Sequence, residues 1–298
     1  MRKSGKSCSS CQKSPAAYDE VLKEEIMRKA FRIGLIISLL LAGVKIGEAS
    51  PLIGASANTL PRGKFMVDGL FWYMNFTESD ILAKGDWVDL PSGDSYEKTL
   101  LLPRFYYGIS NFLTIRFTLP IIAQSKNFDG LKQSSEGIGD LVIDPKICLV
   151  KGSKSIPKIS GFTGIRLPTG DDDASPALGD GSTDFLMGIL VTHKIKPLTG
   201  HATLGYWLNG KDLPDQTFYN LTVEYPFPQN LGALCELNGS MTGEGLLKRD
   251  KHILELCPGL QYSGFKGFKI GAAIKLPVLA KGGYRYHLAP FVKIMYLL

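Results

Sequence analysis

The sequence is poor in metal-binding residues and in long apolar runs. It has four histidines and five cysteines in 298 residues, and only Cys8 and Cys11 show a paired spacing. The three later cysteines are an odd number scattered over the chain, which is not a disulfide framework. The only continuous apolar stretch, residues 34–44, is too short for a helix that spans a bilayer, which needs about 20 residues. The scarcity and spacing of histidine and cysteine argue against a zinc or redox protein.

The short apolar run has the features of a secretory signal peptide. Basic residues precede it, and the small residues Gly47 and Ala49 follow it, as at a cleavage site. We therefore predict cleavage near Ala49, with Met27 as the functional start and residues 1–26 as an upstream extension. The alternative is an N-terminal membrane anchor, although Lys45 interrupts the run.

Much of the positive charge of the chain lies in this N-terminal segment. The formal net charge is +6, but residues 1–49 hold nine Lys or Arg and five Asp or Glu. The remainder has 25 basic and 23 acidic residues, so no basic patch predicts a nucleic-acid partner. We expect the mature chain to begin with a short periplasmic lead-in over residues 50–63, followed by one β domain over residues 64–298.

From residue 64 onward, apolar and polar residues alternate in runs of about ten, the length of a tilted strand that crosses a bilayer. In one run Leu113, Ile115 and Phe117 share a face, and Arg116 lies on the other. This period of two predicts β-strands with one polar face. Twelve runs are predicted, at residues 64–76, 98–108, 111–123, 137–150, 156–169, 183–195, 200–209, 216–226, 229–239, 251–262, 266–278 and 283–298.

The links between the runs alternate in length, with short turns on one side and mostly longer loops, such as residues 77–97 and 124–136, on the other. Outer-membrane barrels have this asymmetry, and aromatic residues near strand ends fit their interface girdles. The sequence therefore predicts an all-β fold, an antiparallel transmembrane β-barrel of twelve strands in the outer membrane of a Gram-negative-type bacterium. The competing fold is a secreted soluble β-sandwich or lipocalin-like barrel.

Prolines lie inside the predicted strands, among them those at positions 103, 145, 258 and 290. Proline cannot donate to a strand ladder, and a closed barrel has no free edge to accommodate it. We therefore expect bulges or missing hydrogen bonds at these positions.

Three stretches carry a resemblance to a known family: "GIGDLVIDPKICL" (137–149), "GFTGIRLPTG" (161–170) and "LGDGSTDFLMGILVTHK" (178–194). They resemble bacterial outer-membrane proteins described as transporters of the meta-pathway of phenol degradation. The matching loop residues are Pro168, Thr169, Gly170, Leu178, Gly179, Gly181 and Asp184. The resemblance implies an outer-membrane barrel that transports a solute. Such barrels usually end in an aromatic residue that the barrel-assembly machinery recognises, whereas this chain ends in Leu298.

If the apolar faces meet lipid, charged residues of both signs line the lumen. The candidates are Arg104, Arg116, Asp140, Asp144, Lys146, Arg166, Glu224, Glu236 and Glu255. Such charges can pair across an open pore or form a network that fills the barrel, and the sequence leaves both possibilities open. The inward aromatic residues Phe162, Trp207 and Phe218 are the hints of an apolar site for a hydrophobic solute.

Three adjacent aspartates, Asp171–Asp173, lie in the link after the strand that ends near residue 169. Carboxylates suit a hard divalent cation, but the spacing is not that of an EF-hand loop. The other interpretation is a solvated hairpin tip whose glycines allow positive φ.

Enzyme signatures are missing from the sequence, which has neither His-x-x-x-His spacing nor a G-x-S-x-G elbow, and no cofactor is predicted. The predicted function is passive transport of small molecules, aromatic compounds among them. The predicted partners are outer-membrane lipid, a small solute and the barrel-assembly machinery, which would contact the C-terminal strand. The alternatives are a non-conducting structural or adhesion-type barrel, a secreted soluble β-barrel and an outer-membrane hydrolase.

Overall fold

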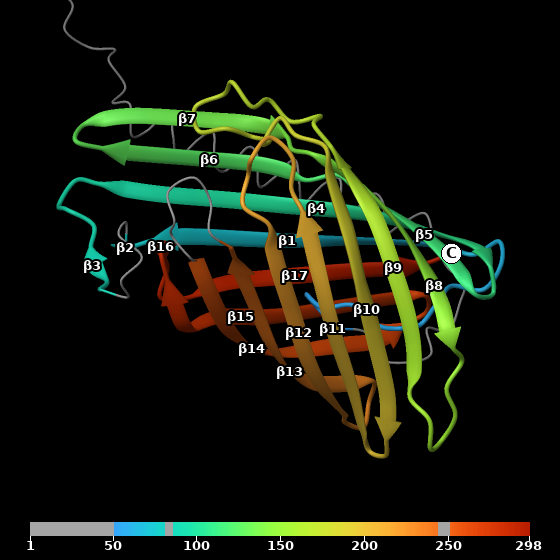
Figure 1. Ribbon diagram of the computed structural model, residues 1–298. Coiled ribbons are helices and arrows are strands. Elements are labelled where there is room, and N and C mark those ends of the chain that lie inside the picture. The colour runs from blue at the N-terminus through green and yellow to red at the C-terminus, as the bar shows by residue number, and fades with distance from the viewer. Residues whose placement is uncertain (1–50, 81–85, 244–250) are drawn as a thin grey trace, which may run out of the picture. The chain divides into compact units, whose positions relative to one another are not determined.

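The computed structural model describes residues 51–80, 86–243 and 251–298, in which every regular element is a β-strand (Figure 1). Within these residues no helix is long and apolar enough to cross a membrane. Twelve strands form the wall of a closed antiparallel barrel, because β1 pairs with the last strand, β17, and also with β4. The wall strands are β1 (Phe65–Phe76), β4 (Ser95–Ser110), β5 (Leu113–Thr118), β8 (Leu141–Val150), β9 (Lys158–Leu167), β10 (Asp184–Ile195), β11 (Leu198–Leu208), β12 (Gln216–Pro226), β13 (Leu231–Thr242), β14 (Lys251–Phe265), β15 (Phe268–Lys281) and β17 (Ala289–Leu297).

Five further strands lie at one end of the wall. β6 (Ile121–Phe128) and β7 (Leu131–Ile138) form a hairpin, and β6 pairs with the first half of β4 while β5 pairs with the second half. Among the described strands, β7 pairs with β6 alone. The remaining three, β2 (Glu78–Asp80), β3 (Val88–Asp89) and β16 (Gly283–Arg285), form a small separate sheet. We call this the loop end, and the opposite end, with short links such as residues 196–197 and 266–267, the turn end.

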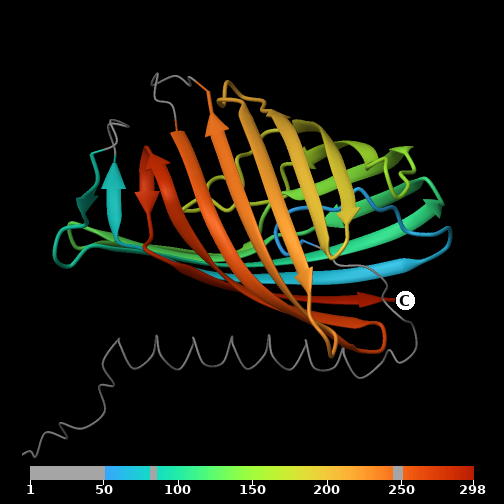
Figure 2. The same cartoon turned by 90° about the horizontal axis from the view of Figure 1, so that it is seen from below.

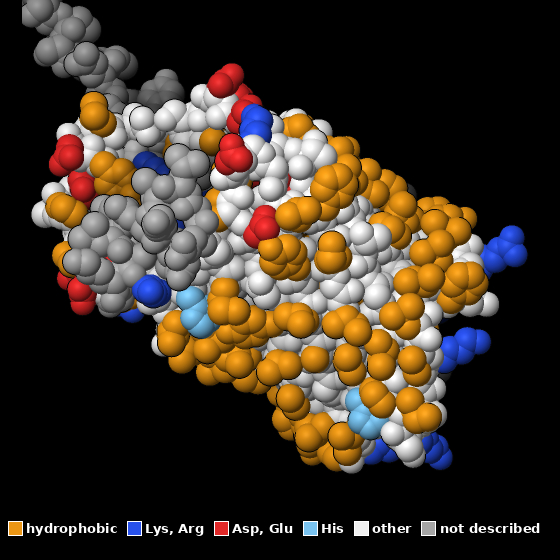
Figure 3. Space-filling view, in the orientation of Figure 1, with side chains coloured by type: hydrophobic (Ala, Val, Ile, Leu, Met, Phe, Trp, Pro, Cys, Tyr) orange, Lys and Arg blue, Asp and Glu red, His pale blue; other side chains and the backbone are white. Residues whose placement is uncertain are grey.

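Alternation along each strand separates an apolar outer face from a largely polar inner face. On β10, Phe185 and Met187 are 52% and 53% exposed, whereas the neighbouring Asp184 and Leu186 are buried. Figure 3 shows the outer apolar side chains as a broad band, with Lys and Arg beyond it at the turn end and acidic residues at the loop end. A band of this kind between charged rims is what a bilayer-spanning barrel requires.

The predicted fold class and strand count are confirmed, and most predicted boundaries lie within a few residues of the observed ones. Other predicted bounds were wrong. Residues 124–136, predicted as a loop, belong to the β6–β7 hairpin, and the loop predicted at 77–97 contains β2, β3 and the start of β4. The run at 111–123 is split into β5 and the start of β6, and the run at 283–298 is split into β16 and β17. The hairpin turns at Asp129-Gly130, both with positive φ, which is a common two-residue hairpin turn that the weakly apolar flanking sequence obscured.

Three of the four prolines at positions 103, 145, 258 and 290 mark interruptions of a ladder, as expected. At Pro103, β4 exchanges its partner, pairing with β6 up to Leu101 and with β5 from Arg104 onward. The β8–β9 ladder skips Pro145, and the β14–β15 ladder skips Pro258. Pro290 keeps its pairing position opposite Ile274. The three later cysteines are free thiols on β8, β13 and β14.

Candidate functional site

The inside of the barrel is partly filled by the chain that precedes β1. We call residues 51–61 the lumen segment, and Figure 2 shows this stretch, coloured blue, within the outline of the barrel wall. Leu52 and Ala57 have no exposed surface. Leu52 packs in an apolar cluster with Leu234, Cys257 and Phe291. The sequence predicts residues 50–63 as a periplasmic lead-in and gives no sign of this position inside the wall.

A single buried carboxylate holds the start of the lumen segment. The backbone N–H groups of Leu52, Ile53 and Gly54 all donate to the carboxylate of Glu236, with distances of 3.2 Å for Ile53 and 3.0 Å for Gly54. Asn220 Nδ2 donates to the same carboxylate at 3.1 Å. Glu236 has no exposed surface. Because hydrogen bonds to a charged group are stronger than neutral ones, Glu236 is the principal anchor of the segment.

Further anchors come from five other strands, and most of them bind backbone groups. The contacts are Leu60 N to Thr114 Oγ1 (2.8 Å), Lys146 Nζ to Ser56 O (2.9 Å), Lys158 Nζ to Asn58 Oδ1 (2.7 Å), Ser160 Oγ to Ala57 O (2.6 Å), Ala57 N to Thr192 Oγ1 (2.9 Å) and Lys293 Nζ to Pro51 O (2.7 Å). The partners lie on β5, β8, β9, β10 and β17. The segment is therefore tied to both sides of the lumen and narrows it.

Two arginines that the sequence predicts in the lumen form ion pairs there. Arg104 Nε lies 2.5 Å from Asp68 Oδ1, and Arg116 Nε lies 2.7 Å from Asp144 Oδ2. Lys293 Nζ is 3.7 Å from Asp68 Oδ2. Asp68 was missed at the sequence level, although its position between the apolar Val67 and Gly69 on β1 fits an inward residue.

The predicted acidic residues Glu224 and Glu255 also face inward and are buried. Glu255 pairs with Lys275 at 2.6 Å and accepts a hydrogen bond from the hydroxyl of Tyr286. Glu224 is different, because neither of its carboxylate oxygens has a hydrogen-bond partner in the described part of the chain. The imidazole of His201 lies beside it, with Nε2 3.8 Å from Glu224 Oε1.

Arg166 and Asp140 are placed at the loop end, where they hold the link between β9 and β10. Arg166 pairs with Asp184 at 2.5 Å and with Asp180 at 2.6 Å, and its guanidinium lies 4.9 Å from the ring centroid of Trp207. Asp140 accepts hydrogen bonds from the N–H groups of Gly170 and Asp180, at 2.9 and 3.0 Å.

The motif residues of this link have structural roles. Thr169 Oγ1 donates to Gly139 O and accepts from Leu141 N, each at 2.9 Å, which closes the ends of two strands. Leu178 is buried against Gly137, and Gly179 lies against the Asp140 carboxylate. Gly181 has a φ of 67°, while Pro168 is exposed.

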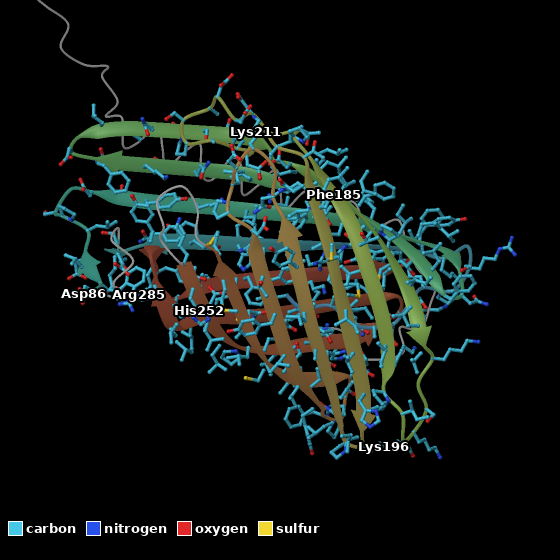
Figure 4. All side chains as sticks on the ribbon, in the orientation of Figure 1. Asp86, Phe185, Lys196, Lys211, His252 and Arg285 are labelled. Carbon is cyan, nitrogen blue, oxygen red and sulfur yellow. The ribbon has the colours of Figure 1, made fainter. Side chains whose placement is uncertain are left out.

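The adjacent aspartates make local contacts in the same link. Asp171 Oδ1 accepts from the N–H groups of Asp173 and Ala174, each at 3.1 Å. Asp172 forms an ion pair with Lys211 at 3.1 Å, and this hydrogen-bonded ammonium lowers the pKa of the Asp172 carboxyl. Figure 4 labels Lys211 at the loop end and Lys196 at the turn end. Across the described residues, no group of three or more His, Cys, Asp or Glu side chains could hold a metal ion.

The remaining space is a cavity of about 770 Å³ between the lumen segment and the wall. This volume lies within the range of sites for small organic ligands. The predicted inward aromatic residues Phe162, Phe218 and Trp207 line it together with Leu186 and Leu190. Charged residues, Arg116 and Lys146 among them, complete the lining.

A closed twelve-stranded wall with a lipid-type outer band and a charged lumen defines an outer-membrane β-barrel. The chain belongs to the family described as "Putative MetA-pathway of phenol degradation", whose model matches residues 87–278. The comparison with curated proteins finds no match.

Two solved structures resemble the fold. The COG4313 outer membrane channel from Pseudomonas putida F1 has a TM-score of 0.72 at 13% identity, covering 84% of this chain and 100% of that one. The translocator domain of the autotransporter NalP from Neisseria meningitidis has a TM-score of 0.50 at 11% identity, covering 93% of this chain and 97% of that one. At these identities the likeness concerns the fold.

Proposed function

We propose that the protein is a passive outer-membrane channel for small molecules, aromatic compounds among them. The observation that carries this proposal is the cavity of about 770 Å³ inside the barrel, whose lining combines aromatic and aliphatic side chains with charged ones. The family name and the fold of the P. putida channel agree with it. A channel needs neither catalytic groups nor a cofactor, and none is proposed.

A non-conducting barrel is the second candidate, and the lumen segment favours it. Hydrogen bonds from six strands hold this segment across the lumen. A segment that stayed in place at all times would close the route for solutes and leave the barrel with a structural role.

Planar-bilayer recording separates the two candidates. We expect the purified protein to give discrete conductance steps in KCl, because the cavity is lined by charged groups that favour water and ions. Liposomes that contain the protein should take up benzyl alcohol and similar small aromatic solutes faster than liposomes without it. A protein that is folded, as judged by heat-dependent migration on gels, yet gives neither steps nor uptake would establish the non-conducting barrel instead.

The proposed location includes removal of residues 1–49 by signal peptidase. The burial of Pro51 and Leu52 inside the barrel supports a mature chain that begins close to this point. N-terminal sequencing of protein from isolated outer membranes should identify Ser50 as the first residue. Protein that retains residues 1–49, or that is recovered in the soluble periplasmic fraction, would contradict the proposal.

The proposed partners follow from the same placement. Outer-membrane lipid would surround the apolar band, and the barrel-assembly machinery would contact β17, the strand that closes the wall. The short turns would face the periplasm, as in other outer-membrane barrels.

A further inference from the structure

The cavity is surrounded by more positive than negative charge. Its lining includes six basic side chains and two acidic ones, Asp68 and Asp144. The basic residues are Arg104, Arg116, Lys146, Lys158, Lys269 and Lys293. Arg104 and Arg116 neutralise the two aspartates. Glu224 and Glu236 are buried outside this lining, so the surface that a solute meets is cationic.

Two of these cations, Lys146 and Lys158, bind neutral oxygens of the lumen segment. Lys146 Nζ donates to Ser56 O at 2.9 Å, and Lys158 Nζ donates to Asn58 Oδ1 at 2.7 Å. No carboxylate of the described residues lies within ion-pair distance of either ammonium. An ammonium group has three N–H donors, so each lysine retains donors for a further acceptor.

An aromatic surface lies directly beside Lys146. In the strand register Lys146 is opposite Phe162, Phe162 is opposite Gly188, and Gly205 is opposite Phe218. A Cβ on Gly188 would lie 2.3 Å from the Phe162 ring, and one on Gly205 would lie 2.2 Å from the Phe218 ring. The two rings therefore lie over glycines, with their centroids 6.4 Å apart.

The same combination occurs at the loop end. Lys126 Nζ lies 4.5 Å from the ring centroid of Tyr96 and 5.7 Å from that of Tyr284. Phe76 stacks on Tyr96 at 4.4 Å. Tyr96 shares the inner face of β4 with Arg104, because both occupy even positions on a regular strand. Aromatic rings and a lysine thus occur together both at the loop end and at the cavity.

We propose that the cavity binds small aromatic carboxylates, with the carboxylate at Lys146 and Lys158 and the ring against Phe162 and Phe218. The inference names a substrate class for the proposed channel. That these carboxylates pass through the barrel rests on the proposed function, whereas their binding in the cavity requires no open pore. A neutral aromatic molecule gains only the ring contacts. An aromatic amine is repelled by the cationic lining, where two like charges are poorly screened.

Calorimetric titration of the detergent-solubilised wild-type protein tests the ligand class without any variant. The probes are benzoate, acetate, benzyl alcohol and benzylamine, which separate the ring from the charge and its sign. Benzoate is expected to bind most tightly of the four. Equal or tighter binding of benzylamine or benzyl alcohol overturns the proposal, and so does equal binding of acetate.

Variants then test the assigned residues. The double variant Lys146→Gln, Lys158→Gln is expected to weaken benzoate binding roughly tenfold or more, because each ammonium offers a charge-assisted hydrogen bond. Lys151→Gln, Lys154→Gln is the matched control, since both residues lie in the exposed β8–β9 link. Lys146→Arg should retain binding, and Phe162→Leu should weaken benzoate but not acetate. Unchanged benzoate binding in the first double variant overturns the assignment.

Conductance distinguishes this inference from the channel proposal. Benzoate should reduce the KCl current of the wild-type protein at lower concentrations than acetate does. Conductance steps without benzoate binding would refute the binding-site inference but support the channel proposal. Benzoate binding in a protein that never conducts would refute the channel proposal but support the binding-site inference.

Discussion

A variant that lacks residues 51–60 is expected to conduct several-fold more current per channel than the wild-type protein. These residues form most of the lumen segment, which lies across the lumen between β5 and β17. Their removal would merge the cavity with the space they occupy, and pore width governs conductance. The released polar groups, Glu236 among them, would face water instead of backbone N–H groups.

The substitution Glu236→Gln provides a milder form of the same experiment. It keeps the shape of the side chain but removes the charge that accepts hydrogen bonds from residues 52–54. We expect intermediate conductance with frequent transitions, because hydrogen bonds to a charged group contribute about 1.5–3 kcal/mol and neutral ones less. Glu255→Gln is the matched control, since Glu255 pairs with Lys275 and not with the segment. Equal conductance in the deletion variant and the wild type would show that residues 51–60 are not the constriction.

The second large effect concerns the face that each strand presents to lipid. Leu204, near the middle of β11, is 53% exposed on the outer surface, while the adjacent Thr203 faces the cavity. Leu204→Arg is expected to lower the free energy of unfolding in liposomes by about 2–4 kcal/mol, the cost of a cation on the lipid face at the midplane. Thr203→Arg should cost clearly less, because its side chain faces a cavity lined by charged groups instead of lipid.

Denaturant titration of the two variants in liposomes provides the measurement. On β5, Ile115 and Thr114 likewise face the outside and the inside of the barrel. However, Thr114 accepts a hydrogen bond from Leu60 N, so an arginine at position 114 would also displace the lumen segment. Thr203 makes no such contact with the segment and is the cleaner control. If Thr203→Arg were the more destabilising change, the assignment of inner and outer faces would be wrong.

The faces of the strands were predictable because alternation is a local property of the sequence. It placed Arg116 and Asp144 on the inner face, and the structure brings them together across β5 and β8. Alternation alone did not single out Asp68, which shares the inner face of β1 with the apolar Leu70 and Trp72. Where the inner face is itself partly apolar, the polar and apolar positions of a strand differ less, and alternation identifies its inward residues less clearly.

The lumen segment could not be predicted for a different reason. Its contacts use mainly backbone N–H and C=O groups, as at Leu52, Ala57 and Leu60, and every residue type carries these groups.

The position of Asp140 could not be predicted for the same reason. Asp140 was expected to line the lumen, but it caps the backbone of Gly170 and Asp180, and the sequence does not reveal which N–H groups a carboxylate will meet.

The route of the lumen segment also constrains the order in which the barrel can assemble. The segment precedes β1 in the chain, yet its anchors include Glu236 on β13 and Lys293 on β17. Those anchors exist only after nearly the whole chain has been translocated, and the wall closes when β17 reaches β1. Because only residues 62–64 separate the segment from β1, we expect its docking and the closure of the β1–β17 seam to occur as a single late event. Until that event, an assembling chain presents an open seam and an unfilled interior at the same time.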